Sequence, residues 1–167
     1  AYAKSEPARR ALVWCNDEGV ERTVNFAELK AGSDRAAQVF TTHGIRKGDP
    51  VLLILKGRLE FWYALLGLHK LGAIGVPATH MLTEHDLAYR FERASIRLVV
   101  TIPDAALEDA IDCAAAKTPG APIAKLLLQG ERPGWFDFTA EMAAANGRWT
   151  RPAGAAATQN GDTMLIY

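Results

Sequence analysis

The stretch Val51-Leu52-Leu53-Ile54-Leu55 decides the fold that this sequence predicts. Its five consecutive apolar residues do not alternate with polar ones, so a strand formed here must be covered on both faces. Coverage on both faces is typical of a parallel sheet that lies between two layers of helices. The stretch therefore indicates an α/β protein rather than an antiparallel sheet with one wet face.

Helical and strand-like segments alternate on both sides of this stretch. Before it, Asn25 and Glu28 form a capping-box pattern that predicts a helix ending near Gly44. After it, apolar spacing predicts helices at residues 59–71, 83–94, 104–116 and 136–145, and strands at residues 73–77, 97–102, 123–128 and 163–167. This order predicts a layered, largely parallel sheet flanked by helices.

A short β-hairpin is expected ahead of the layered core. Two β-prone runs, residues 11–16 and 22–25, flank Asp17-Glu18-Gly19, which is typical of a tight turn. The predicted organisation is a hairpin at 11–25, an α/β core at 26–145, a linker at 146–162 rich in Gly, Ala, Pro and Thr, and a strand at 163–167.

Composition limits the kinds of partner. The 167 residues suit one domain, and nineteen basic residues balance nineteen acidic ones. This balance argues against a nucleic-acid or anionic-membrane binder, and no apolar run approaches the roughly 20 residues of a membrane span. No signal-peptide pattern is visible, so a cytoplasmic protein is expected, with a small molecule or another protein as its partner.

Signatures of covalent or metal chemistry are missing from the sequence. Cys15 and Cys113 are far apart and are expected to be buried free thiols, and the four histidines lack metal-ligand spacing. No nucleophile elbow and no G-x-G-x-x-G motif is present. Residues from Gly72 to Gly75 lead into a strand, so these glycines are expected to allow close helix–sheet packing. The sequence assigns no catalytic, cofactor-binding or metal-binding residue.

Loops after the parallel strands are the places to look for a ligand, because ligands of open α/β sheets gather at the carboxyl ends of strands. These loops are residues 56–58, 77–83, 103–104 and 129–134. Lys56 and Arg58 could attract an anion at a helix start, or could belong to a plain solvated loop. The helix that follows, with Phe61, Trp62 and Tyr63, is apolar nearly all round and is expected to be buried.

Several segments resemble the N-terminal region of AMP-forming acyl-CoA synthetases, members of the adenylate-forming superfamily. The matching segments are residues 23–29 (TVNFAEL), 44–51 (GIRKGDPV), 60–67 (EFWYALLG) and 69–77 (HKLGAIGVP). Residues 79–90 resemble the medium-chain branch of that family. The resemblance implies that residues 1–167 form an incomplete N-terminal subdomain of such a ligase.

The end of the chain extends the resemblance. Residues 162–167 (DTMLIY) resemble the strand that leads into the family's Ser/Thr/Gly-rich phosphate loop. The resemblance implies ATP, Mg²⁺ and CoA as cofactors of a longer parent enzyme, a carboxylic acid as its substrate, and the rest of its own chain as partner. The family's phosphate, adenine and ribose motifs would then follow Tyr167, and residues 1–167 alone would be inactive.

Two residues are candidates for the acyl or pantetheine channel of such an enzyme. Thr79 and His80 follow a predicted strand at its carboxyl end, where ligands gather. The alternative function is a non-catalytic α/β binding or regulatory module, and a third possibility is a structural half of a larger assembly. Fold alone does not separate these functions.

Overall fold

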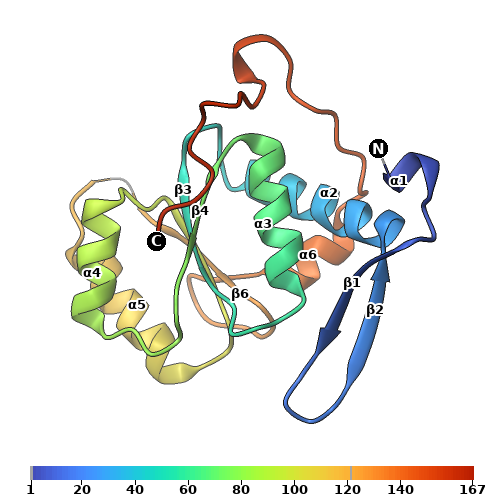
Figure 1. Cartoon of the computed structure of the whole chain (residues 1–167). Coiled ribbons are helices and arrows are strands. Elements are labelled where there is room, and N and C mark those ends of the chain that lie inside the picture. Colours follow the sequence, from blue (N-terminus) through green and yellow to red (C-terminus); the bar gives the residue numbers. More distant parts are fainter. Residues whose placement is uncertain (1, 121) are drawn as a thin grey trace.

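The computed structural model describes residues 2–120 and 122–167 and places a five-stranded sheet between two layers of helices (Figure 1). The strand order is β4-β3-β5-β6-β7, and all neighbouring strands are parallel. The strands are β3 (Pro50–Ile54), β4 (Ile74–Pro77), β5 (Leu98–Thr101), β6 (Ala124–Leu127) and β7 (Phe136–Asp137). The prediction of a largely parallel α/β fold is confirmed.

The stretch that decided the prediction forms the centre of the core. Residues 51–55 are at most 1% exposed, because β3 has strands on both sides and helices on both faces. Two helices, α4 (Glu84–Arg93) and α5 (Ala105–Lys117), pack together on one face (Figure 1). On the other face lie α2 (Phe26–Thr42), α3 (Glu60–Leu71) and α6 (Phe138–Ala144).

The N-terminal hairpin projects from this body (Figure 1). It consists of β1 (Arg10–Cys15) and β2 (Glu21–Asn25), which pair antiparallel and follow the short helix α1 (Tyr2–Ser5). The Asn16 side-chain oxygen accepts hydrogen bonds from two turn amides, those of Glu18 and Val20. Gly19 has a φ of +79°, which glycine adopts without a steric penalty. The hairpin prediction is confirmed.

Helix α2 begins where the capping box predicted it. The Asn25 side chain accepts from the Glu28 amide at 2.9 Å, and the Glu28 carboxylate accepts from the Asn25 amide at 2.9 Å. These two bonds satisfy donors that the first helical turn leaves free. The start of α2 is therefore fixed by local chemistry at its first turn.

Close contact between α2 and α3 depends on two glycines. A Cβ atom on Gly67 would lie 2.9 Å from the Ala37 backbone nitrogen, and one on Gly32 would lie 2.5 Å from the Tyr63 ring. Gly75 has the expected packing role, since a Cβ there would approach Leu65 to 2.7 Å. Gly72 differs: it ends α3 in the left-handed conformation, with φ of +71°.

Two predicted elements near the C-terminus differ from the structure. Phe136 and Asp137 were expected in a helix, but they pair with β6 as β7, and the Asp137 side chain caps α6 by accepting from the Ala140 amide. The strand expected at residues 163–167 is a single parallel bridge between Gly75 and Leu165. Only two backbone hydrogen bonds join this segment to the edge strand β4, too few for a ladder.

Two expectations about burial are also wrong. Helix α3 is not buried all round, because Trp62 lies on its outer side and is 41% exposed. Cys15 and Cys113 are both exposed rather than buried. Cys15 ends a strand of the two-stranded hairpin, which has no helix layer over it, and Cys113 faces away from the buried side of α5, which carries Ile111 and Ala114.

The segment after α6 runs back across the molecule over α2 and α3 (Figure 1). It contains one turn of 3₁₀ helix, η1 (Gly154–Ala156). Lys47 holds this segment with its ammonium group, which donates to the Ala157 carbonyl at 2.8 Å and pairs with Asp162 at 2.8 Å. Within residues 2–120 and 122–167, none of the helices combines the length and the apolar character that crossing a bilayer requires.

Candidate functional site

The carboxyl edge of the sheet has the geometry of a ligand crevice. Strands β3 and β5 are neighbours, yet α3 after β3 and α5 after β5 lie on opposite faces (Figure 1). The loops after these two strands therefore diverge, and ligands of open α/β sheets bind at such switch points. The loops concerned are residues 55–58 and 102–104.

The loop at residues 56–58 has an unusual backbone conformation and is held by a hydrogen bond from the hairpin. Lys56 and Gly57 are both left-handed, with φ of 37° and 68°. The Trp14 indole nitrogen, on the hairpin, donates to the Gly57 carbonyl at 2.6 Å. Lys56 and Arg58 are exposed, and in the part of the chain that the structure describes they form no ion pair. The hairpin thus holds the loop in place, while the side chains of Lys56 and Arg58 in the loop are exposed to solvent.

Thr79 and His80 lie at the same edge, one strand farther out. The Ala78 amide donates to the Leu53 carbonyl at 3.0 Å, which places the loop after β4 beside the end of β3. Thr79 is exposed, His80 is half-buried, and the Thr79 hydroxyl accepts from the Met81 amide at 3.3 Å. Neither residue lines the cavity between α2 and α6, the cavity beside α1, or the hollow at residues 130–137. The structure places the loop that carries them beside the end of β3.

The loop after β5 has a structural role. The Asp104 side chain accepts from the Leu107 amide at 3.1 Å and so caps α5. The Asp104 amide donates to the Glu108 carboxylate at 2.9 Å. Immediately before this loop, the Thr101 hydroxyl is buried without a hydrogen-bond partner among the described residues. Sequence reasoning missed Thr101, because a threonine in an apolar strand gives no signal of an unpaired hydroxyl.

The loop at residues 129–134 takes part in a charge network with α5. Arg132 pairs with Glu108, Asp109 and Asp112. The Asp112 carboxylate also accepts hydrogen bonds from Lys125 and Trp135. Burial by itself would raise the pKa of the Asp112 carboxyl, but its hydrogen bonds from Lys125, Arg132 and Trp135 lower it. The network joins α5 to the sheet. Its acidic and basic side chains are paired with one another, which favours a structural role.

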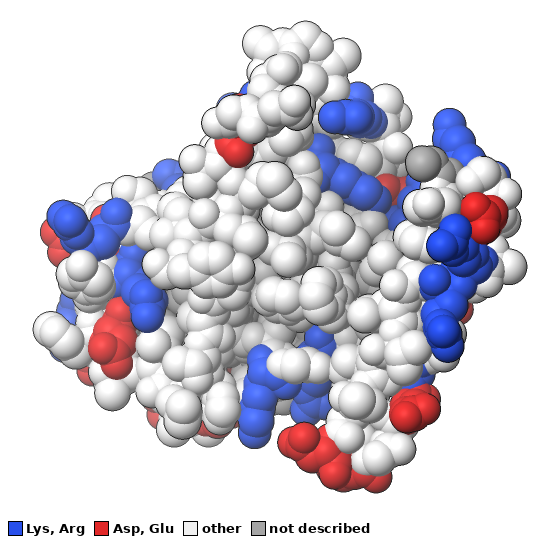
Figure 2. Space-filling view, in the orientation of Figure 1, with Lys and Arg blue, Asp and Glu red and all other residues white. Residues whose placement is uncertain are grey.

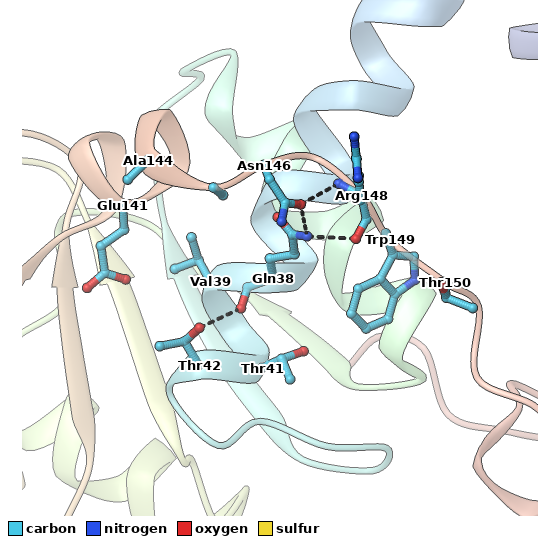
Figure 3. Close-up of a pocket in the computed structure, with 11 residues that line it drawn as sticks. Gln38, Val39, Thr41, Thr42, Glu141, Ala144, Asn146, Arg148, Trp149 and Thr150 are labelled. Carbon is cyan, nitrogen blue, oxygen red and sulfur yellow. Dashed lines mark hydrogen bonds between the residues drawn. The ribbon is translucent and has the colours of Figure 1, made fainter.

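A cavity of about 830 Å³ lies between α2, α6 and the segment that follows α6 (Figure 3). The Gln38 amide spans its rim and donates to the Asn146 side chain and the Arg148 carbonyl, both at 2.7 Å. Close by, the His43 ring contacts the Glu141 carboxylate at 2.7 Å. These polar groups bind one another, so this cavity presents few free groups to a ligand.

The four histidines occupy separate places. His43 pairs with Glu141, His80 and His85 flank the start of α4, and His69 lies near the end of α3. Across residues 2–120 and 122–167, no three His, Cys, Asp or Glu side chains are grouped so that they could hold a metal ion.

The chain matches known proteins over its whole length. Residues 1–167 match the model of a family described as AMP-binding enzyme. The chain is 33% identical to the mitochondrial acyl-coenzyme A synthetase ACSM1 of Homo sapiens, over 94% of this chain and 26% of that protein. It is 29% identical to the mitochondrial ACSM5 of Rattus norvegicus, over 96% of this chain and 27% of that protein.

Solved structures give the same picture of the fold. A Mycobacterium tuberculosis fatty acyl CoA synthetase superposes with a TM-score of 0.77 at 26% identity, over 98% of this chain and 30% of that chain. A Brucella canis acyl-CoA synthetase superposes with a TM-score of 0.74 at 26% identity, over 89% of this chain and 27% of that chain. The chain spans about a quarter of the length of the curated relatives it matches.

The comparisons correct one expectation. A cytoplasmic protein was expected, but the curated relatives cited above are mitochondrial. The expectation depended on the absence of a signal-peptide pattern. Targeting segments are read and removed separately from the folded domain, so the residues of the domain do not reveal the compartment.

Proposed function

Because this chain belongs to the AMP-binding enzyme family, we propose that it is the N-terminal part of an acyl-CoA synthetase. The observation that carries the proposal is the match of the family model to all of residues 1–167. The superposition on a fatty acyl CoA synthetase over 98% of the chain supports it, since the strands and helices follow the same path. Fold likeness alone would not support an activity.

The proposed reaction has two steps. A carboxylate oxygen of the acid attacks the α-phosphorus of ATP and forms an acyl-adenylate, and pyrophosphate leaves. The CoA thiol, losing its proton, then attacks the acyl carbonyl, and AMP leaves with the electron pair of the broken carbon–oxygen bond. Mg²⁺ would neutralise phosphate charge in the first step. No residue of this chain is assigned to it.

The proposed role of this chain is to build the sheet that supports the active site. Residues 163–167 lie beside β4 at the edge of the sheet. The Gly75 amide donates a hydrogen bond to the Met164 carbonyl, and the Ile166 amide donates one to the Gly75 carbonyl. We propose that a phosphate-binding loop follows them, as the resemblance of residues 162–167 implies. Residues 1–167 would then lack the groups that hold the triphosphate.

The proposed substrate is a carboxylic acid of short to medium chain length or a small aromatic acid. The support is the resemblance of residues 79–90 to the medium-chain branch. We propose Thr79 and His80 as residues that line the acyl or pantetheine channel, since both lie at the carboxyl edge of the sheet beside the end of β3. The channel would be completed by residues outside this chain.

A panel of acids tests the substrate class. The full-length enzyme, supplied with ATP, Mg²⁺ and CoA, is expected to release AMP with one or more acids from acetate through decanoate or with benzoate. Release of AMP is measured for each acid against a reaction without acid. A preference for long-chain or amino acids would overturn the substrate class. No AMP with any acid would favour the non-catalytic binding or regulatory module.

A histidine variant tests the channel. His80→Ala is expected to raise KM for the acid or for CoA severalfold, because the side chain is proposed to line the path of one of them. His85→Ala is the matched control, since His85 is an exposed residue of the nearby helix α4. If the two variants have the same kinetics as the unchanged enzyme, His80 does not line the channel.

A further inference from the structure

A second cavity, of about 760 Å³, lies among α1, α2, α3 and the C-terminal segment. Its volume is within the range of small-molecule sites, roughly 300–1,000 Å³. Much of its wall is apolar and comes from four parts of the chain. These apolar residues include Phe26 and Leu29 of α2, Leu66 of α3 and Met164 of the C-terminal segment.

The polar side of this cavity carries more positive than negative charge. Asp34 has a side chain only 3% exposed, and its two oxygens contact Lys30 and Lys70, each at 2.5 Å. The Lys70 ammonium also donates to the Ser33 hydroxyl at 2.6 Å. One carboxylate therefore faces two ammonium groups. Basic side chains gather below the C-terminal segment, over this part of the molecule (Figure 2).

A third cation adds to this excess. Arg151 lines the cavity, is exposed, and forms no ion pair with any residue that the structure describes. Asp34 is the one acidic residue among those lining this cavity. Three cations and one anion leave a local excess of two positive charges next to apolar walls. Burial lowers the pKa of Lys70, and Asp34 only partly opposes this effect, so a second anion would stabilise its charged form.

We propose that this cavity binds a small amphipathic anion. The anionic head group, a carboxylate or a phosphate ester, would lie between Lys30, Lys70 and Arg151. Its apolar part would lie against Phe26, Leu66 and Met164, which removes apolar surface from water. The proposal goes beyond the proposed function and does not depend on it, because it rests only on the charges and the apolar walls of this cavity.

Calorimetric titration of the chain with four probes tests the ligand class. Octanoate and octyl phosphate carry an anionic head and an apolar chain, whereas octanol lacks the charge and acetate lacks the chain. At least one of the two amphipathic anions is expected to bind at least tenfold more tightly than octanol and acetate. Which of the two binds more tightly identifies the head group. Failure of both to bind up to about 10 mM, or equal binding of octanol, would overturn the proposal.

Three variants test the place of binding. Arg151→Met and Lys30→Met are each expected to weaken binding of the amphipathic anion about tenfold, whereas Arg93→Met should leave it unchanged. Arg93 is a suitable control because it is an exposed arginine on α4, outside this cavity. Arg151 forms no ion pair with the residues that the structure describes, so Arg151→Met tests the site even if Lys30→Met disturbs folding. Equal binding by Arg151→Met and Arg93→Met would contradict the proposed site.

Discussion

Replacing Phe138 with alanine is expected to lower the free energy of unfolding by roughly 3–5 kcal/mol. The Phe138 side chain is fully buried, and its ring lies 5.7 Å from that of Phe40. This pair joins α6, which follows the last strand of the sheet, to α2. The substitution removes most of a buried ring and leaves a cavity between the two helices.

Urea denaturation followed by circular dichroism measures this loss. Phe136→Ala is the matched control, because Phe136 lies two residues earlier and is 48% exposed. A smaller loss, of about 1 kcal/mol, is expected there, since about half of the Phe136 side chain is already in contact with water. Domains are stable by roughly 5–15 kcal/mol, so the loss expected for Phe138→Ala is a large fraction of the total stability. At moderate urea concentrations, a smaller fraction of Phe138→Ala molecules than of unchanged molecules should be folded. Equal losses in the two variants would contradict the packing of α6 against α2.

Gly67→Ala is expected to destabilise the chain by roughly 1–3 kcal/mol, although alanine is the better helix former. The new methyl group would lie 2.9 Å from both the Ala36 Cβ atom and the Ala37 backbone nitrogen. A backbone atom cannot turn aside as a flexible side chain can, so α2 and α3 must separate. The packing that they lose outweighs the gain of about 1 kcal/mol in helix propensity.

Thermal and urea denaturation of Gly67→Ala beside Gly161→Ala test this expectation. Gly161 has open space around the position of a Cβ atom and no positive φ, so its substitution should be neutral or slightly stabilising. A Gly67→Ala variant as stable as Gly161→Ala would show that α2 and α3 are not in close contact at this point.

The main features of the fold could be predicted from local patterns. The continuous apolar run at residues 51–55 placed a doubly covered strand, and β3 is the buried strand that it predicted. Asn25 and Glu28 marked the first turn of α2 because both bonds of a capping box are local. These predictions needed no knowledge of which segments meet in space.

Features that depend on distant contacts could not be predicted in this way. Phe136 suits a helical apolar pattern, and it becomes a strand residue because it pairs with Leu126 of β6. Trp62 belongs to an apolar helix, but only the packing of α3 on α2 decides which residues of that helix face outward. The exposure of Cys15 follows from the hairpin standing apart from the helix layers.

The candidate sites also contain features that local patterns predict and features that depend on distant contacts. The position of Thr79 and His80 at the carboxyl edge could be predicted, because every loop after a parallel strand lies there. Lys30 and Asp34 are spaced as an ordinary helical ion pair. The approach of Lys70 to Asp34 depends on the packing of two helices, so the charge excess in the second cavity had no signal in the sequence.

We propose that residues 1–167 belong to an enzyme that activates a carboxylic acid with ATP and that these residues alone do not carry out the reaction. Exchange of labelled pyrophosphate into ATP is to be measured side by side for the full-length protein and for residues 1–167. We expect acid-dependent exchange by the full-length protein and, for residues 1–167, no exchange above a control without enzyme, since groups that stabilise developing charge supply most of the catalysis. Acid-dependent exchange by residues 1–167 alone, or none by the full-length protein with any acid of the panel, would contradict this proposal.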